Sequence, residues 1–316
     1  MVAVTVIGGY LGAGKTTLVN HLLRHADGVK LAVLVNEFGD LPIDADLIKG
    51  QSDNVISISG GCVCCSFGSD LVGALMDLPQ MSPEIDHVLI EASGVALPGS
   101  IADTVSLLSA YRLDSVAVVA DASTVVSRAA DRFVGDTVER QLEAADLVIL
   151  NKVDLVDRAD LDALLEFTGQ KAPRARTVSV RQGQVPIEVL LSHEPPIRNV
   201  PPRAPSHPHL HLDDPYLRLT AHLAPLGSAR AFAQALAAPA LGLLRAKGFV
   251  DNVDGSRDLI QVVGARWTVS PAPDTPGPAR LVCIGIRERM SENAINDLIA
   301  AHAASNEMLL QGETPP

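Results

Sequence analysis

The sequence predicts a doubly wound α/β domain built on a mostly parallel sheet, followed by a smaller α+β domain. Through residues 1–192, short apolar runs that end in Gly, Asn or Asp alternate with amphipathic stretches, which is the pattern of repeated βα units. Residues 193–208 are instead rich in proline and show no convincing period, as is typical of a linker. We therefore expect two domains, at 1–192 and 209–316, joined by this segment.

Each expected element has its own apolar run or amphipathic period. The strands of the first domain are expected at 2–7, 31–35, 55–58, 87–90, 115–119, 147–150 and 176–180. Helices are expected between them at 16–25, 70–78, 99–109 and 160–167. In the second domain we expect strands at 216–221, 259–263 and 280–286 and helices at 228–236 and 291–302. The segment LLRAKGFV at 243–250 indicates a helix end that passes into a strand through Gly248.

The amino-acid composition argues against some classes of binding partner. The chain has 316 residues, of which 47% are hydrophobic, and this is enough to bury a sizeable core. Its net charge of -12 argues against a nucleic-acid or anionic-membrane partner, because either would repel the protein. No basic segment precedes the first apolar run and no long uninterrupted apolar stretch follows, so we expect neither a signal peptide nor a membrane span. We expect the protein in the cytoplasm, where clustered cysteines are more often metal ligands or redox groups than disulfides.

The segment GGYLGAGKTT follows the first expected strand and opens the first expected helix. Gly9, Gly14, Lys15 and Thr16 fit Gly-x-x-x-x-Gly-Lys-Ser/Thr, the phosphate-binding P-loop pattern. Its glycines let backbone N–H groups converge on phosphate oxygens, its lysine neutralises the β and γ phosphates, and its threonine hydroxyl can bind Mg²⁺. The sequence thus predicts a P-loop NTPase. The predicted nucleotide contacts in this loop are Gly9, Gly12, Ala13, Gly14, Lys15, Thr16 and Thr17.

The tetrapeptide NKVD follows the expected strand at 147–150. At the carboxyl end of that strand, Asn151, Lys152 and Asp154 would lie beside the nucleotide. The Asp154 carboxylate can accept hydrogen bonds from N1–H and from the exocyclic amine of guanine, a pair of donors that adenine lacks, while the Lys152 stem covers the ring. The motif predicts GTP and GDP as the bound nucleotides.

The strand at 87–90 runs into Glu91, and Gly94 follows three residues later. In P-loop NTPases a carboxylate at this place holds Mg²⁺, usually through water, and a glycine N–H soon after it contacts the γ-phosphate. We therefore expect Thr16 and Glu91 at the magnesium ion. GTP hydrolysis is expected to depend on these two residues together with Lys15 and Gly94, whereas no motif identifies the residue that orients the attacking water.

Three of the four cysteines, Cys62, Cys64 and Cys65, stand within the segment GGCVCC. It follows the expected strand at 55–58, so in a parallel sheet it would lie at the same edge as the P-loop. Glu37 follows another expected strand and should lie at that edge too. Thiolates with one acid or water suit tetrahedral Zn²⁺ or Co²⁺. We favour a metal site over a redox pair, because no thioredoxin-like C-x-x-C context accompanies the cysteines.

The fourth cysteine and the paired or alternating histidines lie outside these motifs. Cys283 falls within an expected strand and is predicted to be a core residue. His21 and His25 are one helical turn apart and predict an exposed helix face. Three further histidines could bind a metal on one face of an extended segment or could simply be solvated. They are His207, His209 and His211.

In their order along the chain, these motifs resemble the CobW-type branch of the metal-handling P-loop GTPases. The resemblance rests on GGYLGAGKTTLVNHLL, VNEFG, GGCVCC, EASG followed by Pro98, NKVD, and LLRAKGF followed by QVVG. It implies a metal-binding GTPase, often called a zinc chaperone or metallochaperone, with slow intrinsic GTP hydrolysis and a CobW C-terminal domain. It also implies transition-metal ligands at Cys62, Cys64 and Cys65. Many relatives have a long linker rich in His and Asp, whereas this linker leads into only three spaced histidines.

We interpret the sequence as a GTPase that couples GTP binding and hydrolysis to delivery of a transition metal to a client metalloprotein. Zinc is the favoured metal, and the sequence does not identify the client. Mg²⁺ and GTP would order the loops that carry Glu37, Gly94 and the cysteines. A close alternative is a cobalt or iron insertion activator, as in cobalamin synthesis or nitrile hydratase maturation. A small-molecule kinase, or a signalling GTPase with incidental thiols, would belong to another class. A homodimer is left open.

Overall fold

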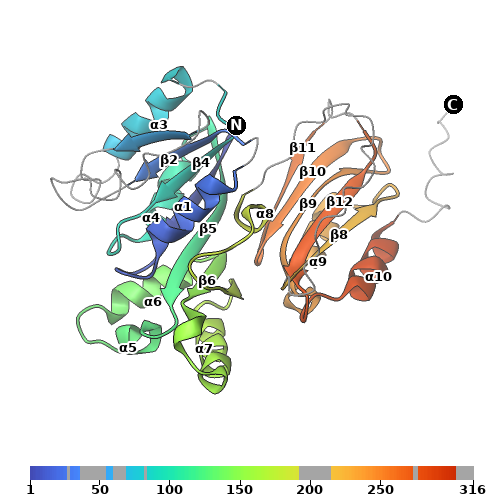
Figure 1. Cartoon of the computed structure of the whole chain (residues 1–316). Coiled ribbons are helices and arrows are strands. Elements are labelled where there is room, and N and C mark those ends of the chain that lie inside the picture. Colours follow the sequence, from blue (N-terminus) through green and yellow to red (C-terminus); the bar gives the residue numbers. More distant parts are fainter. Residues whose placement is uncertain are drawn as a thin grey trace, which may run out of the picture. The chain divides into compact units, whose positions relative to one another are not determined.

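The computed structural model describes residues 1–26, 29–35, 55–59, 69–81, 84–191, 215–272 and 277–303. The chain forms two compact units, Met1–Arg198 and Asn199–Pro316 (Figure 1). The linker predicted at 193–208 lies outside the described residues. Among the helices of the described ranges, none is both long and apolar enough to cross a bilayer.

The first unit is built on a sheet of seven described strands that pair in parallel. They are β1 Val2–Gly8, β2 Leu31–Val35, β3 Val55–Ser59, β4 His87–Glu91, β5 Tyr111–Asp121, β6 Leu147–Asn151 and β7 Arg176–Ser179. The strand order is β3-β2-β4-β1-β5-β6-β7, so β1 lies at the centre. Strands that are covered on both faces favour unbroken apolar runs, as in the fully buried LAVLV of β2.

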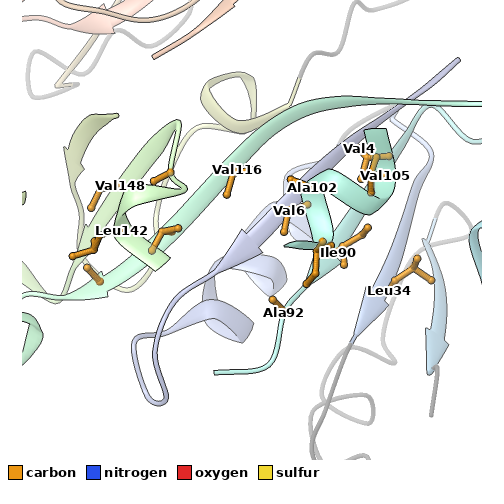
Figure 2. Close-up of a cluster of buried hydrophobic side chains, with 14 of the residues drawn as sticks. Val4, Val6, Leu34, Ile90, Ala92, Ala102, Val105, Val116, Leu142 and Val148 are labelled. Carbon is orange, nitrogen blue, oxygen red and sulfur yellow. The ribbon is translucent and has the colours of Figure 1, made fainter. Parts of the chain in front are cut away.

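Helices cover both faces of this sheet. They are α1 Lys15–Arg24, α3 Ser69–Met81, α4 Pro98–Ser106, α5 Val125–Ala129, α6 Gly135–Glu143, α7 Arg158–Lys171 and α8 Ile187–Leu190. Figure 2 shows one face, where Ala102 and Val105 of α4 lie against Val4 and Val6 of β1. Because side chains alternate along a strand, Thr5 points to the opposite face, where its hydroxyl donates to a carbonyl of α8 at 3.1 Å. The predicted doubly wound fold is confirmed.

The second unit is an antiparallel sheet with two helices. Its elements are β8 Tyr216–His222, α9 Ala229–Leu236, β9 Leu243–Asp251, β10 Arg257–Val263, β11 Arg266–Pro271, β12 Arg280–Ile286 and α10 Glu292–His302. The strand order is β11-β10-β9-β12-β8. Phe232 and Leu236 of α9 and Ile295 of α10 are fully buried against the sheet. This is the smaller α+β domain that the sequence predicts.

The segment 243–250 is not a helix end, and that prediction is wrong. The segment forms most of β9, which pairs with β10 on one side and with β12 on the other. Buried residues follow one another from Leu243 to Ala246, as expected of a strand in the interior of a sheet. Leu, Arg, Ala and Lys favour a helix locally, but pairing to two neighbouring strands overrides that preference.

Several element ends also differ from the prediction. α4 ends at Ser106, whereas the sequence suggests residue 109, and β5 begins at Tyr111, four residues before the predicted start. The sequence analysis did not identify β11, α5, α6 or α8. α5 and α8 have five and four residues, too few to show a helical period. No residue of β11 is buried, and α6 carries four charged residues among nine, so few apolar residues mark either element.

Candidate functional site

The carboxyl ends of β1, β4, β5 and β6 lie along one edge of the parallel sheet. The strand registers pair Ile7 with Glu91 and Asp121 with Asn151. Neighbouring strands are about 4.8 Å apart, so the loops that leave these strands come together in one place. The P-loop, the EASG turn and the NKVD turn all begin at this edge.

The P-loop passes from β1 into α1 through glycines in left-handed conformations. The backbone angle φ is +131° at Gly9, +76° at Gly12 and +104° at Gly14. Gly14 also has no room for a side chain, since a β-carbon there would lie 2.4 Å from Nδ2 of Asn151. α1 begins at Lys15, and the N–H groups of a first helical turn point back toward the loop. The loop therefore has the form of an anion-binding helix N-terminus.

The side chains around the start of α1 differ in exposure. Lys15 is buried, and its Nζ donates to the carbonyl oxygen of Tyr10 at 3.4 Å, which holds the ammonium against the loop. Ala13 is buried and Thr17 is exposed. Phosphate oxygens carry more negative charge than a backbone carbonyl, so a bound phosphate would compete well for the Lys15 ammonium.

Thr16 and Glu91 come from distant parts of the sequence and are in direct contact. The Thr16 hydroxyl donates to Oε1 of Glu91 at 2.8 Å, and Glu91 is only 4% exposed. Hydroxyl and carboxylate oxygens are ligands that Mg²⁺ accepts in nucleotide sites, directly or through water. The two residues that the sequence assigns to magnesium are thus brought together, and their chemistry fits that ion.

The EASG turn packs against the P-loop. A β-carbon at Gly94 would lie 2.9 Å from Cα of Leu11, so only glycine allows this approach. Nε2 of Gln141, from α6, donates to the carbonyl oxygens of Gly94 at 3.2 Å and Ala96 at 2.8 Å. The Gly94 backbone is therefore held beside the loop that would carry the phosphates, where the predicted N–H contact to a γ-phosphate could form.

Asn151 joins the P-loop to a loop that the sequence analysis missed. Its Nδ2 donates to the carbonyl oxygen of Ala13, and its Oδ1 accepts from the backbone N–H of Gly183, each at 3.0 Å. Gly183 follows β7 at the same sheet edge, and the polar run RQGQ directly after the expected strand at 176–180 was the signal that could have identified it. Asp154 is exposed in the short 3-10 turn Val153–Leu155, labelled η1. It lies three residues beyond Asn151, at the open side of this junction.

Lys152 connects the NKVD turn to β5. Its Nζ donates to the carbonyl oxygen of Gly12 at 2.8 Å and to Oδ2 of Asp121 at 2.6 Å. Burial acts to raise the pKa of the Asp121 carboxyl, but hydrogen bonds from Lys152 and Ser123 outweigh it and leave that pKa lowered. The sequence analysis missed Asp121, although it ends β5 as Glu91 ends β4.

Two family models cover most of the chain. The model described as CobW/HypB/UreG, nucleotide-binding domain, matches residues 3–179. The chain belongs to this family. The model of the cobalamin synthesis protein cobW C-terminal domain matches residues 222–303, within the second unit. The CobW resemblance predicted from the motifs is confirmed.

Several relatives of this CobW-family protein are named zinc chaperones. The zinc chaperone CobW of a Sinorhizobium species is 32% identical over 348 residues, which cover 94% of this chain and 96% of that protein. The zinc chaperone YjiA of Escherichia coli is 33% identical over 199 residues, or 60% of this chain and 61% of that protein. The crystal structure of the Zn(II)-bound YjiA GTPase from E. coli has a TM-score of 0.46 and 25% identity, covering 96% of this chain and 99% of that one.

The residues predicted to bind a transition metal in this CobW chain lie outside the described residues. The strands that lead to them are described: Val35, which ends β2, pairs with Ser59 of β3 and with Glu91 of β4. β2 and β3 therefore end at the same sheet edge as β1, which precedes the P-loop. Outside the described residues are Glu37, Cys62, Cys64, Cys65, His207, His209 and His211.

Cys283, His21 and His25 lie within the part of the chain that the structure describes. Cys283 is buried in β12, and burial raises the pKa of its thiol to about 12, so its prediction as a core residue is confirmed. His25 is exposed, as predicted for a helix face. That prediction is wrong for His21, which is partly buried and whose Nε2 donates to the carbonyl oxygen of Val185 at 3.0 Å. A partner 164 residues away could not be read from helical spacing.

Proposed function

We propose that this CobW-family GTPase is a metallochaperone, which uses GTP binding and hydrolysis to load and release zinc for a client metalloprotein. The strand register carries the proposal. The carboxyl ends of β1, β4, β2 and β3 form one row through Ile7, Glu91, Val35 and Ser59. Three strand spacings separate β1 from β3, so the end of β3, which GGCVCC follows in the sequence, lies roughly 14 Å from the end of β1. The names of the relatives described above support zinc as the cargo.

The proposed roles at the nucleotide follow from the contacts of each side chain. Lys15 would exchange its carbonyl partner for phosphate oxygens and offset their negative charge. Thr16 and Glu91 would hold Mg²⁺, which when bound supplies positive charge to the phosphates. The Gly94 N–H, fixed beside the P-loop, would donate to the γ-phosphate. Asp154 would select guanine.

The proposed cargo site uses the cysteines that follow β3. Thiolates of Cys62, Cys64 and Cys65, with Glu37 as an oxygen ligand, form a donor set that suits tetrahedral Zn²⁺ and also Co²⁺. Cytosolic conditions keep such thiols reduced, so we place this activity in the cytoplasm. The γ-phosphate would order the loops at the sheet edge, and its loss would weaken the metal site and release the ion to the client.

The test measures nucleotide hydrolysis and zinc binding on the same protein. The rates of phosphate release from GTP and from ATP are compared. The amount of zinc that stays bound per chain after dialysis against a chelator is measured. The variant with Cys62, Cys64 and Cys65 changed to Ser should lose the tightly held zinc and keep its preference for GTP. Cys283→Ser is the matched control and should keep both. Tight zinc binding by the triple variant, or equal hydrolysis of ATP and GTP by the wild type, would contradict the proposal.

A further inference from the structure

His21 and His25 bring two imidazole rings together at the end of α1. His21 lies in the last turn of the helix and His25 is its C-cap residue, so the spacing is H-x-x-x-H across one turn. The ring centroids are 4.3 Å apart, and the ring planes are inclined by 37°. Two histidines at positions i and i+4 of a helix form a recurrent pair of zinc ligands.

The hydrogen bonds of both rings determine which nitrogen carries the proton. His21 Nε2 lies 3.0 Å from the carbonyl oxygen of Val185, and His25 Nδ1 lies 2.7 Å from the carbonyl oxygen of His21. A carbonyl can only accept, so both of these ring nitrogens are donors. In the neutral rings the unprotonated nitrogens are then Nδ1 of His21 and Nε2 of His25. Metal-binding histidines use this arrangement, in which one nitrogen donates to a carbonyl and the other binds the ion.

The surroundings also favour neutral imidazole at His21. Burial lowers the pKa of His21, and the neighbouring His25 and Arg24 lower it further, against the opposing effect of the hydrogen bond to Val185. A histidine must be neutral to bind a metal. Protons therefore compete less with a metal ion at this ring than at an ordinary surface histidine.

We propose that Nδ1 of His21 and Nε2 of His25 bind a divalent transition-metal ion such as Zn²⁺, with water in the remaining positions. Zn–N bonds are about 2.0–2.1 Å long, so the two ligating nitrogens must come within about 4.2 Å of each other, and ring centroids 4.3 Å apart allow this. The site lies on α1 and shares no residue with the segment GGCVCC. With two protein ligands it would bind zinc more weakly than a site of three thiolates, and it would respond to zinc once the cysteines are loaded.

The histidine pair is linked to the nucleotide loops by a chain of hydrogen bonds. A metal on Nδ1 fixes the His21 tautomer that donates to the carbonyl oxygen of Val185, in the loop between β7 and α8. The N–H of Val185 donates to the carbonyl of Gly183 at 3.1 Å, and Gly183 holds Asn151 against the P-loop. Zinc on the histidine pair should therefore raise guanine-nucleotide affinity, a consequence that rests on the proposed function of the nucleotide site.

The experiment uses the full-length untagged chain with Cys62, Cys64 and Cys65 changed to Ser, so that the proposed cargo site cannot contribute. Zinc affinity is measured by competition with a chromophoric chelator. We expect one zinc ion per chain, bound more than about tenfold more weakly after His25→Gln, because loss of even an outer contact to a ligand costs 10–100-fold. Arg24→Gln, in the same helical turn, is the control and should bind zinc like the parent. His25 is exposed, so its variant should fold, which GDP binding checks.

A second readout identifies the ligating atoms. Nitrogen NMR of the histidine rings should show zinc shifting Nδ1 of His21 and Nε2 of His25, while the other two ring nitrogens keep their protons. Zinc should also raise the affinity for a fluorescent GDP in the parent and leave it unchanged in His25→Gln. Equal zinc affinity in the parent and His25→Gln, or zinc shifts at the opposite nitrogens, would overturn the site. A nucleotide affinity that does not respond to zinc in the parent would overturn the link to the P-loop.

Discussion

In the parallel sheet of the first unit, the polar groups of the site stand at the carboxyl ends of strands, whereas Cys283 lies in the middle of a strand of the antiparallel sheet. Glu91, Asp121 and Asn151 each end a strand, and each contacts the P-loop, the first turn of α1 or the NKVD turn. Cys283 is packed among the core residues of the second unit and is 1% exposed. A strand end gives a reactive group room for a ligand, whereas a mid-strand position buries it. We predict that the cysteines that follow β3 in the sequence act as groups of the first kind.

The largest effect is expected at the P-loop. Lys15→Ala should lower the GTP hydrolysis rate by about 10²–10³-fold, since it removes charge stabilisation of the phosphates in a partly enclosed site. Steady-state phosphate release measures this. Lys30→Ala is the control, because Lys30 forms a surface ion pair with Glu84 at the opposite end of β2, and it should keep the wild-type rate. If Lys15→Ala hydrolysed GTP at the wild-type rate, the loop that follows β1 would not be the site of GTP hydrolysis.

A change of base preference is the next expected effect. Asp154→Asn should weaken GTP binding by more than about tenfold and improve binding of xanthosine triphosphate, because an amide can donate where the carboxylate can only accept. Competition with a fluorescent nucleotide gives both affinities. Asp160→Asn, an exposed acid in the first turn of α7, should change neither affinity. If Asp154→Asn kept the wild-type order of nucleotide affinities, another residue would have to recognise the base.

The smallest effect on function is expected at Cys283. Its pKa of about 12 and its burial predict no reaction with a thiol reagent at pH 8 in the folded variant that has Ser at Cys62, Cys64 and Cys65. Full reaction should follow in denaturant. Cys283→Ser should lower the free energy of unfolding by about 1–3 kcal/mol, because a hydroxyl is buried in an apolar core, yet leave zinc content unchanged. Rapid labelling of Cys283 in the folded protein would contradict the contrast between reactive groups at strand ends and a buried cysteine in the middle of a strand.

Local sequence predicted the parts of the site that depend on a strand followed by a short turn. The P-loop, Glu91 and Asn151 were found because each motif directly follows an apolar run, and the parallel order then brings the strand ends together. The sequence did not reveal that Lys152 pairs with Asp121 or that Asn151 holds Gly183, since both contacts depend on how distant loops pack. The same limit applies to β9, whose residues favour a helix until β10 and β12 pair with them.

The central claim is that nucleotide state controls the metal site at the sheet edge. Zinc affinity of the wild-type chain is measured by chelator competition in the presence of Mg²⁺ with GDP, and again with a non-hydrolysable GTP analogue. Coupling free energies between sites are typically 1–3 kcal/mol, so zinc should bind about 5–150-fold more tightly with the analogue, and zinc should tighten the analogue by the same factor. The triple variant at Cys62, Cys64 and Cys65 should show no such tight site in either state. Equal wild-type zinc affinities with GDP and with the analogue would contradict the account.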